Sequence, residues 1–262
     1  MPTSSGDGGR PAAYLTVDGL TAGYGGAPIV NGASASVGLG EIVTIVGPNG
    51  AGKSTFLKAV VGMISASGGK VTLAGEDVTN MRANLLAKRG LGYVPQVNDV
   101  FDTLTVADNL EMGGYLLPRV EIARRSEAVL EVFPSLKRML KRTASKLSGG
   151  ERKMLAMGRV MMLEPKVLVL DEPTSNLSAE LSRVLLEDHV KRLGNAGAAV
   201  LIVEQKALAA LSISDWGYVM AGGTVKVSSS ATDLLTRKDI GEVFLGRGID
   251  ESGMPRASGA ST

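Results

Sequence analysis

Hydrophobic positions along the chain fall into short apolar runs separated by stretches with helical spacing. The clearest runs predict β-strands at Ala13–Val17, Glu41–Val46, Val167–Leu170 and Ala199–Val203. Between them, apolar residues at helical spacing predict helices over Ser54–Val61, Val120–Val132, Gly149–Met162 and Ser178–Leu193. Buried strands that alternate with helices predict an α/β domain with a parallel sheet, whose ligands bind beyond the carboxyl ends of the strands.

The same pattern divides the chain into regions. Residues 97–162 have helical spacing and no strand-like run, so we expect a helical lobe beside a core formed by residues 13–96 and 163–246. Asp18-Gly19 is expected to close the first strand as a turn. Residues 1–12 and 247–262 are small and polar, and we expect them to form flexible tails.

Composition narrows the possible chemistry. The chain has no Cys and one His, which excludes a disulfide framework, thiol catalysis and a multi-histidine metal site. Its 28 basic and 26 acidic residues nearly cancel, so no nucleic-acid partner is indicated. The longest apolar stretch, Ala198–Val203, is far too short to span a bilayer, and the first ten residues lack the apolar core of a signal peptide. We therefore expect a cytosolic protein, and its 34 Gly suggest backbone that passes close to a ligand.

A phosphate-binding loop is predicted at GPNGAGKST, which follows a strand and opens a helix. A chance glycine-rich turn is the alternative, and the position between strand and helix argues against it. Backbone N–H groups of such a loop surround phosphates, Lys53 reaches the β- and γ-phosphates, and the Ser54 hydroxyl faces Mg²⁺. The residues expected to bind ATP here are Gly47, Pro48, Asn49, Gly50, Ala51, Gly52, Lys53, Ser54 and Thr55.

Two adjacent carboxylates end the apolar strand VLVLDEP. A strand directs Asp171 and Glu172 to opposite sides, so they should have different functions. Asp171 is suited to Mg²⁺, and Glu172 to act as the base or to position water for attack on the γ-phosphate. By itself the pattern is as often structural as functional, but together with the phosphate loop it indicates hydrolysis.

The segment LSGGE predicts a helix start with a capping box, in which Ser148 and Glu151 satisfy each other's backbone. The plain interpretation is a well-capped helix. However, Gly149 and Gly150 leave the first N–H groups open to an anion. The helix leads through a short turn into the Asp171 strand, so we expect its capped end to face away from the chain's own phosphate loop. It would then bind a phosphate held by another subunit.

Taken in order, Tyr24, GPNGAGKST, Gln96 in YVPQ, LSGGE, VLVLDEP and VEQ resemble the ATP-binding subunits of ABC transporters, from about Ala13 to Gly246. Further stretches (MGGY after DNL, VFPSL, MLAMGR and a terminal FLG) are similar to the shorter of the two ATPases in branched-chain amino acid importers. The resemblance implies a phosphate-loop NTPase core with a mainly parallel sheet, an N-terminal antiparallel β portion and a helical lobe.

The resemblance also implies how the site is assembled. Two copies, or two homologous ATPases, would form a head-to-tail dimer around two ATP molecules with Mg²⁺. Each ATP would be held by one subunit's phosphate loop and by Ser148, Gly149 and Gly150 of the other. Tyr24 would stack on adenine, although an exposed turn aromatic is the alternative. Gln96 would touch Mg²⁺ and the attacking water, although it could be an ordinary polar loop residue.

For its partners, the resemblance implies two integral membrane permease subunits, contacted by the Gln96 loop and the helical lobe. It further implies a solute-binding protein as an indirect partner, and a location at the cytoplasmic face of the cell membrane. The metal-binding residues would be Ser54, Gln96 and Asp171, and the catalytic residues Glu172, Gln205 and Lys53.

Two positions depart from the family pattern. Most members have a His where this chain has Gln205, whose amide donates a hydrogen bond but carries no proton. The one His, His189, lies within a predicted helix and is interpreted as a surface or interhelix residue. Asn176 replaces the usual Gly or Ala, and Ala179 the usual Pro. Asn tolerates a left-handed backbone, so this loop can keep its shape.

Other functions remain open at the level of sequence. The same ATPase could serve a urea or short-chain amide importer, because nothing in this chain contacts cargo. A DNA-associated ABC-type ATPase is disfavoured, since the stretch between Lys53 and Ser148 is short and has no heptad run for coiled-coil arms. A regulatory subunit without turnover is disfavoured by the presence of Lys53, Asp171 and Glu172.

If Glu172 alone supplies the base, no imidazole controls the pH dependence of ATP hydrolysis. We expect the ATPase rate to show no step near pH 6.5, the usual range of His, that depends on His189. The measurement is the rate against pH for the wild type and for His189→Ala. A fall in rate below about pH 6.5 that disappears in His189→Ala would contradict the hypothesis.

Overall fold

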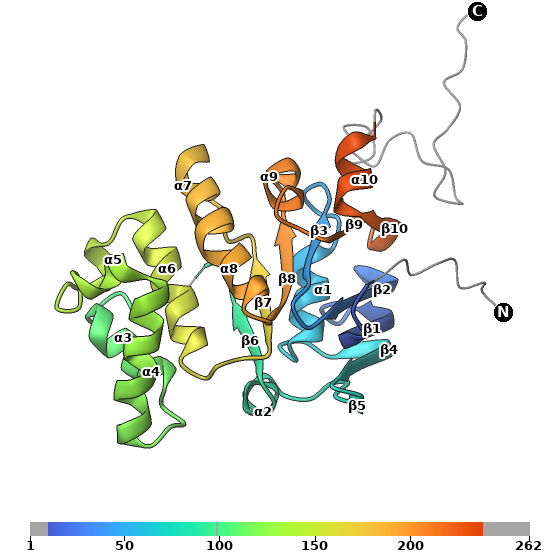
Figure 1. Cartoon of the computed structure of the whole chain (residues 1–262). Helices are drawn as coiled ribbons and strands as arrows, with labels where there is room; N and C mark the ends of the chain where they lie inside the picture. Colours follow the sequence, from blue (N-terminus) through green and yellow to red (C-terminus); the bar gives the residue numbers. More distant parts are fainter. Residues whose placement is uncertain (1–9, 98, 238–262) are drawn as a thin grey trace, which may run out of the picture.

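The computed structural model describes residues 10–97 and 99–237, which form two sheets and a group of helices (Figure 1). The larger sheet has six strands in the order β10-β9-β3-β8-β7-β6. Adjacent strands from β9 to β6 pair in parallel, and β10 pairs antiparallel with β9. Its strands are β3 (Ile42–Val46), β6 (Leu91–Val94), β7 (Val167–Asp171), β8 (Ala199–Glu204), β9 (Trp216–Ala221) and β10 (Thr224–Ser230). The predicted mainly parallel sheet is confirmed.

The smaller sheet is antiparallel and has the order β2-β1-β4-β5. Its strands are β1 (Ala13–Ala22), β2 (Val30–Gly38), β4 (Ala66–Leu73) and β5 (Glu76–Asp77). The prediction that Asp18-Gly19 closes the first strand is wrong. The pairing of β1 with β2 shifts between Val17 and Leu20, and Gly19 has φ +56°, so the pair forms a bulge within a longer strand. Pairing on both edges of β1 outweighs the local turn preference.

Helices flank both sheets. They are α1 (Lys53–Val60), α2 (Ala83–Lys88), α3 (Val106–Gly113), α4 (Arg119–Val132), α5 (Pro134–Lys137), α6 (Gly149–Met161), α7 (Ala179–Arg183), α8 (Lys191–Asn195), α9 (Ala207–Leu211) and α10 (Ala231–Thr236). A 3₁₀ turn spans Ala144–Lys146, and a π-helical stretch, Val184–Val190, joins α7 to α8. Figure 1 shows α3 to α6 gathered on one side of the molecule, opposite the antiparallel sheet. We call these four helices the helical lobe. No helix within the described residues is long and apolar enough to cross a membrane.

The central strands of the six-stranded sheet, β3, β7 and β8, are buried on both faces. Val43, Ile45 and Leu201 face a core shared with β1, β2, β4 and α1. Alternate residues such as Leu168 and Ile202 face a second core, which they share with α8 and with the helical lobe. Side chains of a strand alternate between faces, so two cores on one sheet require apolar residues at successive positions. This explains the near-continuous apolar runs.

Arg10 lies in the stretch expected to be a flexible tail, but the structure anchors it. Its guanidinium donates to the buried Glu41 carboxylate at 2.6 Å and lies 4.5 Å from the centre of the Trp216 ring. A carboxylate in the interior needs a paired cation, so the tail prediction is wrong at Arg10. Residues 1–9 and 247–262 of the predicted tails, and residues 238–246 of the predicted core, lie outside the described residues.

Two glycines, Gly62 and Gly75, both have a left-handed backbone, but only Gly62 lacks space for a side chain. Gly62 (φ +70°) follows α1, and a Cβ there would overlap the carbonyl oxygen of Met81. Gly75 (φ +82°), between β4 and β5, has open space around the position of a Cβ.

We expect Gly75→Ala to lower the free energy of unfolding by about 1 kcal/mol, through backbone strain alone. Gly62→Ala should lower it by about 2–4 kcal/mol, because overlap with the Met81 carbonyl adds to that strain. Urea denaturation measures both losses. Equal losses would contradict the backbone contact at Gly62.

Candidate nucleotide-binding site

The loop between β3 and α1 depends on its glycines. Gly50 (φ +78°) and Gly52 (φ +97°) adopt backbone conformations that other residues rarely reach. At Gly47, an added Cβ would overlap the carbonyl oxygen of Met220 on β9. Behind the loop, Gly223 donates from its backbone N–H to the Ala51 carbonyl at 3.0 Å. The loop is therefore curled by its own glycines and supported by the turn between β9 and β10.

A cavity of about 570 Å³ opens beside this loop. Its lining comprises Ile29, Asn49, Gly50, Ala51, Gly52, Lys53, Ser54, Thr55, Glu172 and Gln205. The buried Lys53 ammonium donates to the carbonyl oxygens of Gly47 at 2.7 Å and Pro48 at 3.0 Å. Burial lowers the pKa of Lys53, while the nearby carboxylates, Glu172 first, oppose that shift. The arrangement places a cation and the backbone of the loop around a space suited to phosphates.

Asp171, the last residue of β7, lies beside Ser54. The Ser54 hydroxyl donates to one Asp171 oxygen at 3.1 Å, and the Tyr93 hydroxyl donates to the other at 3.3 Å. Burial is the main cause that raises the pKa of Asp171. Within the described residues no three His, Cys, Asp or Glu side chains gather as a metal cage. A hydroxyl and one carboxylate fit Mg²⁺, which proteins hold through few carboxylates, water and substrate phosphates.

Glu172 follows β7 in a left-handed conformation (φ +47°), and its carboxylate is buried. The side-chain amide of Gln96 donates to one of its oxygens at 2.8 Å, and that of Gln205 donates to the other at 2.7 Å. Residues after three neighbouring strands, β6, β7 and β8, therefore meet at one carboxylate. Asp171 and Glu172 share no hydrogen-bond partner, as expected for side chains on opposite sides of a strand end.

Two further residues support this cluster and were given no role by the sequence analysis. Glu204, the last residue of β8, is buried and accepts from the backbone N–H groups of Thr174 at 2.8 Å and Gln205 at 3.1 Å. Burial raises the pKa of Glu204. Tyr93 donates to Asp171, and burial raises the pKa of its hydroxyl. Glu204 and Tyr93 belong to the motifs VEQ and YVPQ, which also contain Gln205 and Gln96.

The predicted capping box at the start of α6 is present. The Ser148 hydroxyl accepts from the Glu151 N–H, and the Glu151 carboxylate accepts from the Ser148 N–H at 2.7 Å. Ser148, Gly149 and Gly150 do not belong to the lining of the phosphate-loop cavity. Instead, a Cβ at Gly149 would lie 3.1 Å from the Leu177 side chain. This chain therefore does not bring its own capped helix end to its phosphate loop.

Tyr24 follows β1, and 58% of its surface is exposed. The Lys58 ammonium, on α1, lies 5.8 Å from the centre of the Tyr24 ring. The ring thus lies beside α1, which follows the phosphate loop, and it is exposed enough to accept a stacking partner.

His189 lies away from this cluster, on the π-helical stretch that joins α7 to α8. Its buried ring packs on Phe133 with centroids 4.8 Å apart, and burial lowers its pKa. The interhelix interpretation is confirmed and the surface alternative is wrong. Asn176 has φ +61°, the left-handed backbone that the sequence analysis considered tolerable for Asn.

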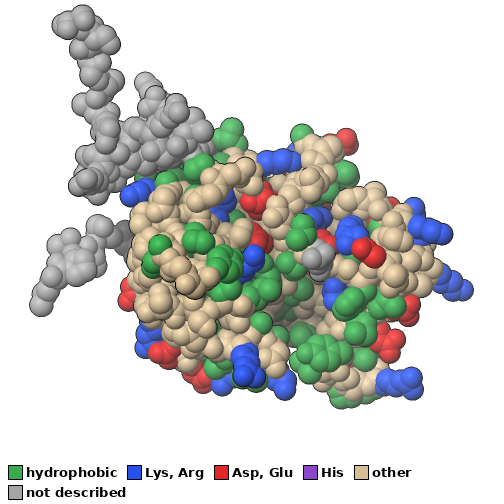
Figure 2. Space-filling model, turned by 180° about the vertical axis from the view of Figure 1, so that it is seen from behind, with side chains coloured by type: hydrophobic (Ala, Val, Ile, Leu, Met, Phe, Trp, Pro, Cys, Tyr) green, Lys and Arg blue, Asp and Glu red, His purple; other side chains and the backbone are tan. Residues whose placement is uncertain are grey.

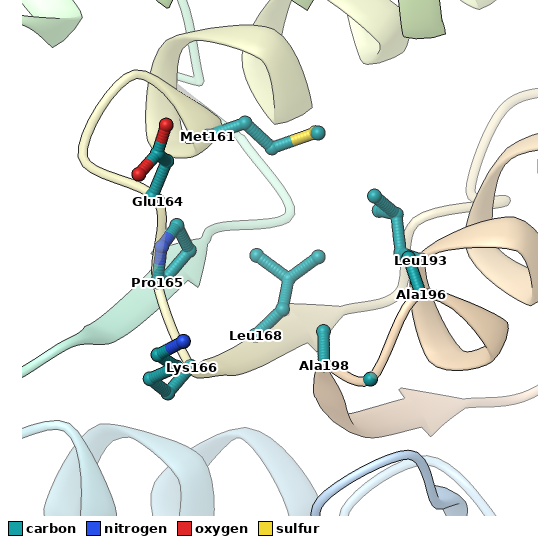
Figure 3. A pocket seen from close by; sticks show the side chains of 9 residues that line it. Met161, Glu164, Pro165, Lys166, Leu168, Leu193, Ala196 and Ala198 are labelled. Atoms are coloured by element: carbon teal, nitrogen blue, oxygen red, sulfur yellow. The ribbon is translucent and has the colours of Figure 1, made fainter.

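Another cavity, of about 310 Å³, lies at the amino ends of β7 and β8 (Figure 3). Met161, Leu168 and Leu193 line it together with Glu164 and Lys166 at its edge. Ligands of parallel α/β sheets bind at the carboxyl ends of the strands, where the phosphate loop and Glu172 lie. The polar cavity beside the loop is therefore the better candidate site.

Comparison with known proteins identifies the family of the chain. The sequence pattern of the ABC transporter family matches residues 30–175. A probable branched-chain amino acid transport ATP-binding protein, LivF, of Archaeoglobus fulgidus is 37% identical over 87% of this chain and 96% of its own length. The high-affinity branched-chain amino acid transport ATP-binding protein BraG of Pseudomonas aeruginosa is 35% identical over 88% of this chain and 99% of its own. The predicted resemblance is confirmed.

The similarity extends beyond these two proteins. The lipopolysaccharide export ATP-binding protein LptB of Escherichia coli is 29% identical over 89% of this chain and 98% of its own. A solved nucleotide-free ATP-binding cassette of an ABC transporter superposes with a TM-score of 0.80 at 26% identity, covering 90% of this chain and all of that one. The chain therefore belongs to the ABC transporter family and is one of its ATP-binding, ATP-hydrolysing subunits.

Proposed function

We propose that this ATPase powers an importer of branched-chain amino acids by closing and opening a head-to-tail dimer. The observation that carries the hydrolytic part is the convergence of Lys53, Glu172 and Gln205 on one cavity. Glu172 is the base for the attacking water, and its two amide partners fix the direction of its carboxylate. Gln205 orients this carboxylate without exchanging a proton.

The remaining residues bind the nucleotide in this proposal. Lys53 donates to the β- and γ-phosphates, which are stronger acceptors than the loop carbonyls it contacts in the structure. Ser54, Asp171 and Gln96 hold Mg²⁺, which neutralises charge on the phosphates. Tyr24 stacks on adenine, because its exposed ring stands beside α1.

The dimer is proposed because the site is incomplete in one chain. Ser148, Gly149 and Gly150 present the start of α6 but do not line the phosphate-loop cavity. In a head-to-tail dimer, the same helix end would reach the γ-phosphate held by a second copy, or by a homologous ATPase. Helix N-termini bind anions through free N–H groups, so each site would be closed by the other subunit.

Two membrane permease subunits are the proposed partners, with a solute-binding protein acting through them at the cytoplasmic face of a membrane. Figure 2 shows a hollow bordered by hydrophobic side chains. A groove of about 350 Å³ is lined by Tyr93, Pro95, Met112, Tyr115 and Arg159, among others, and Met112 and Tyr115 are exposed. The groove lies between the core and the helical lobe. We propose residues 97–162 as the bounds of that lobe.

The cargo is proposed from LivF and BraG, whose names assign them to branched-chain amino acid transport. Urea or short-chain amides are the alternative cargo, since the residues described here bind nucleotide. LptB, by its name, serves export, so the direction of transport also belongs to the proposal. A DNA-associated role receives no support from the site.

Glu172→Gln should remove the base while keeping the size of the side chain. One of its two amide partners must then turn its own oxygen toward the new NH2 group, because the variant keeps a single acceptor oxygen. We expect turnover to fall at least 100-fold, by about the contribution of a general base, while ATP-dependent dimers accumulate in size-exclusion chromatography. Glu131→Gln, at an exposed position on α4, is the matched control and should retain wild-type turnover. Unchanged turnover and unchanged dimerisation in Glu172→Gln would show that the base is assigned wrongly.

Tyr115→Asp should weaken co-purification of the permease subunits by about tenfold without changing ATP binding, because it puts a charge into an apolar groove. Leu235→Asp, on α10 and away from the groove, is the control.

ATPase assays of the intact complex with a panel of cargo-loaded binding proteins then identify the cargo. Stimulation by urea or amides in place of leucine, isoleucine or valine would overturn the cargo assignment alone.

A further inference from the structure

Two basic residues of α6 hold the segment that carries Gln96. The Lys153 ammonium donates to the backbone carbonyl of Gln96 at 2.7 Å and to an oxygen of Asp99 at 3.0 Å. Arg152 donates to the other Asp99 oxygen at 3.0 Å and also pairs with Asp102. Lys153 and Asp99 are both buried. A buried ammonium is retained only where paired charges and carbonyls replace its water, and here they do.

Gln96 is therefore held at two points. Its backbone carbonyl is bound by Lys153, and its side-chain amide donates to Glu172 at 2.8 Å. A glutamine amide has several rotatable bonds, so its reach to a fixed carboxylate depends on where its backbone is held. The contacts form a continuous path from α6 through Gln96 to the residue after β7.

We propose that Lys153 is a positioning residue that fixes Gln96 against Glu172. The inference rests on the roles proposed above for Gln96 and Glu172. Lys153 follows the start of α6 at Ser148 by less than two helical turns, roughly 8 Å along the axis. One rigid helix thus links the end that would contact the partner's ATP to the orientation of the base in the chain's own site.

The bland alternative is that Lys153 only neutralises Asp99 and stabilises the segment. Arg152 distinguishes the two explanations, since it pairs with the same carboxylate and otherwise with Asp102 rather than with Gln96. If charge balance were the whole role, removing either cation would have the same effect on turnover. If the Gln96 contact matters, only Lys153 should affect kcat.

The test is steady-state ATP hydrolysis by the full-length protein with matched variants. Lys153→Met keeps the apolar stem and removes every donor. We expect its kcat to fall about tenfold with KM for ATP within about twofold, because orientation of the base is lost while the phosphate loop is intact. Arg152→Met should keep kcat within about twofold. Equal losses in the two variants, or no loss in Lys153→Met, would overturn the proposal.

Conservative variants provide a second measurement. Lys153→Arg keeps donors for both acceptors, and Lys153→Gln keeps a single uncharged NH2 group on a shorter side chain. We expect kcat to decrease in the order Lys, Arg, Gln, Met at constant KM, and the first three test the order even if Lys153→Met fails to fold. An Arg variant slower than the Gln variant would contradict positioning through hydrogen bonds.

A double-mutant cycle shows whether Lys153 acts through Gln96. If it does, Gln96→Ala combined with Lys153→Met should be no slower than Gln96→Ala alone. Multiplying losses would place Lys153 on a separate route and overturn the proposal. Gln96→Ala also tests the function on which the inference rests. Wild-type turnover in this variant refutes the proposed role of Gln96, whereas slow Gln96→Ala with fast Lys153→Met refutes the positioning role alone.

Discussion

The Glu172 carboxylate, held between two side-chain amides, is the interaction around which the site is arranged. Gln96 follows β6, Glu172 follows β7 and Gln205 comes directly after β8. These three strands are parallel neighbours in the sheet, so their carboxyl ends meet at one edge. A different strand order would separate the three side chains, whatever their sequence motifs.

Both hydrogen-bond partners of the Glu172 carboxylate are uncharged amides. Neither amide gains or loses a proton near neutral pH, so its direction is fixed by hydrogen bonds that do not titrate. Charged groups contact the surroundings of this carboxylate instead. Lys53 binds the carbonyls of the phosphate loop, Glu204 accepts from the Gln205 N–H, and Lys153 pairs with Asp99 beside the Gln96 carbonyl. Buried charges of this kind persist because each is paired or hydrogen-bonded.

The sequence predicted the elements whose pattern is purely local. The strands β3, β7 and β8 are covered on both faces, and their apolar runs were sufficient to identify them. It missed β2 (VNGASASVG) and β4 (ASGGKVTL), whose small and polar residues give no apolar run. These strands are stabilised by pairing with β1 across the antiparallel sheet, which also turned the expected Asp18-Gly19 turn into a bulge.

The sequence by itself determined the phosphate loop, the capping box at Ser148 and the two carboxylates after β7, because contiguous residues set each of these local geometries. Only the tertiary structure decided that Gln96 and Gln205 share Glu172, that Lys153 binds the Gln96 backbone, and that Arg10 is anchored. His189 likewise packs on Phe133, which lies between α4 and α5. These contacts join residues far apart in the chain, and strand order and packing, which no local pattern encodes, bring them together.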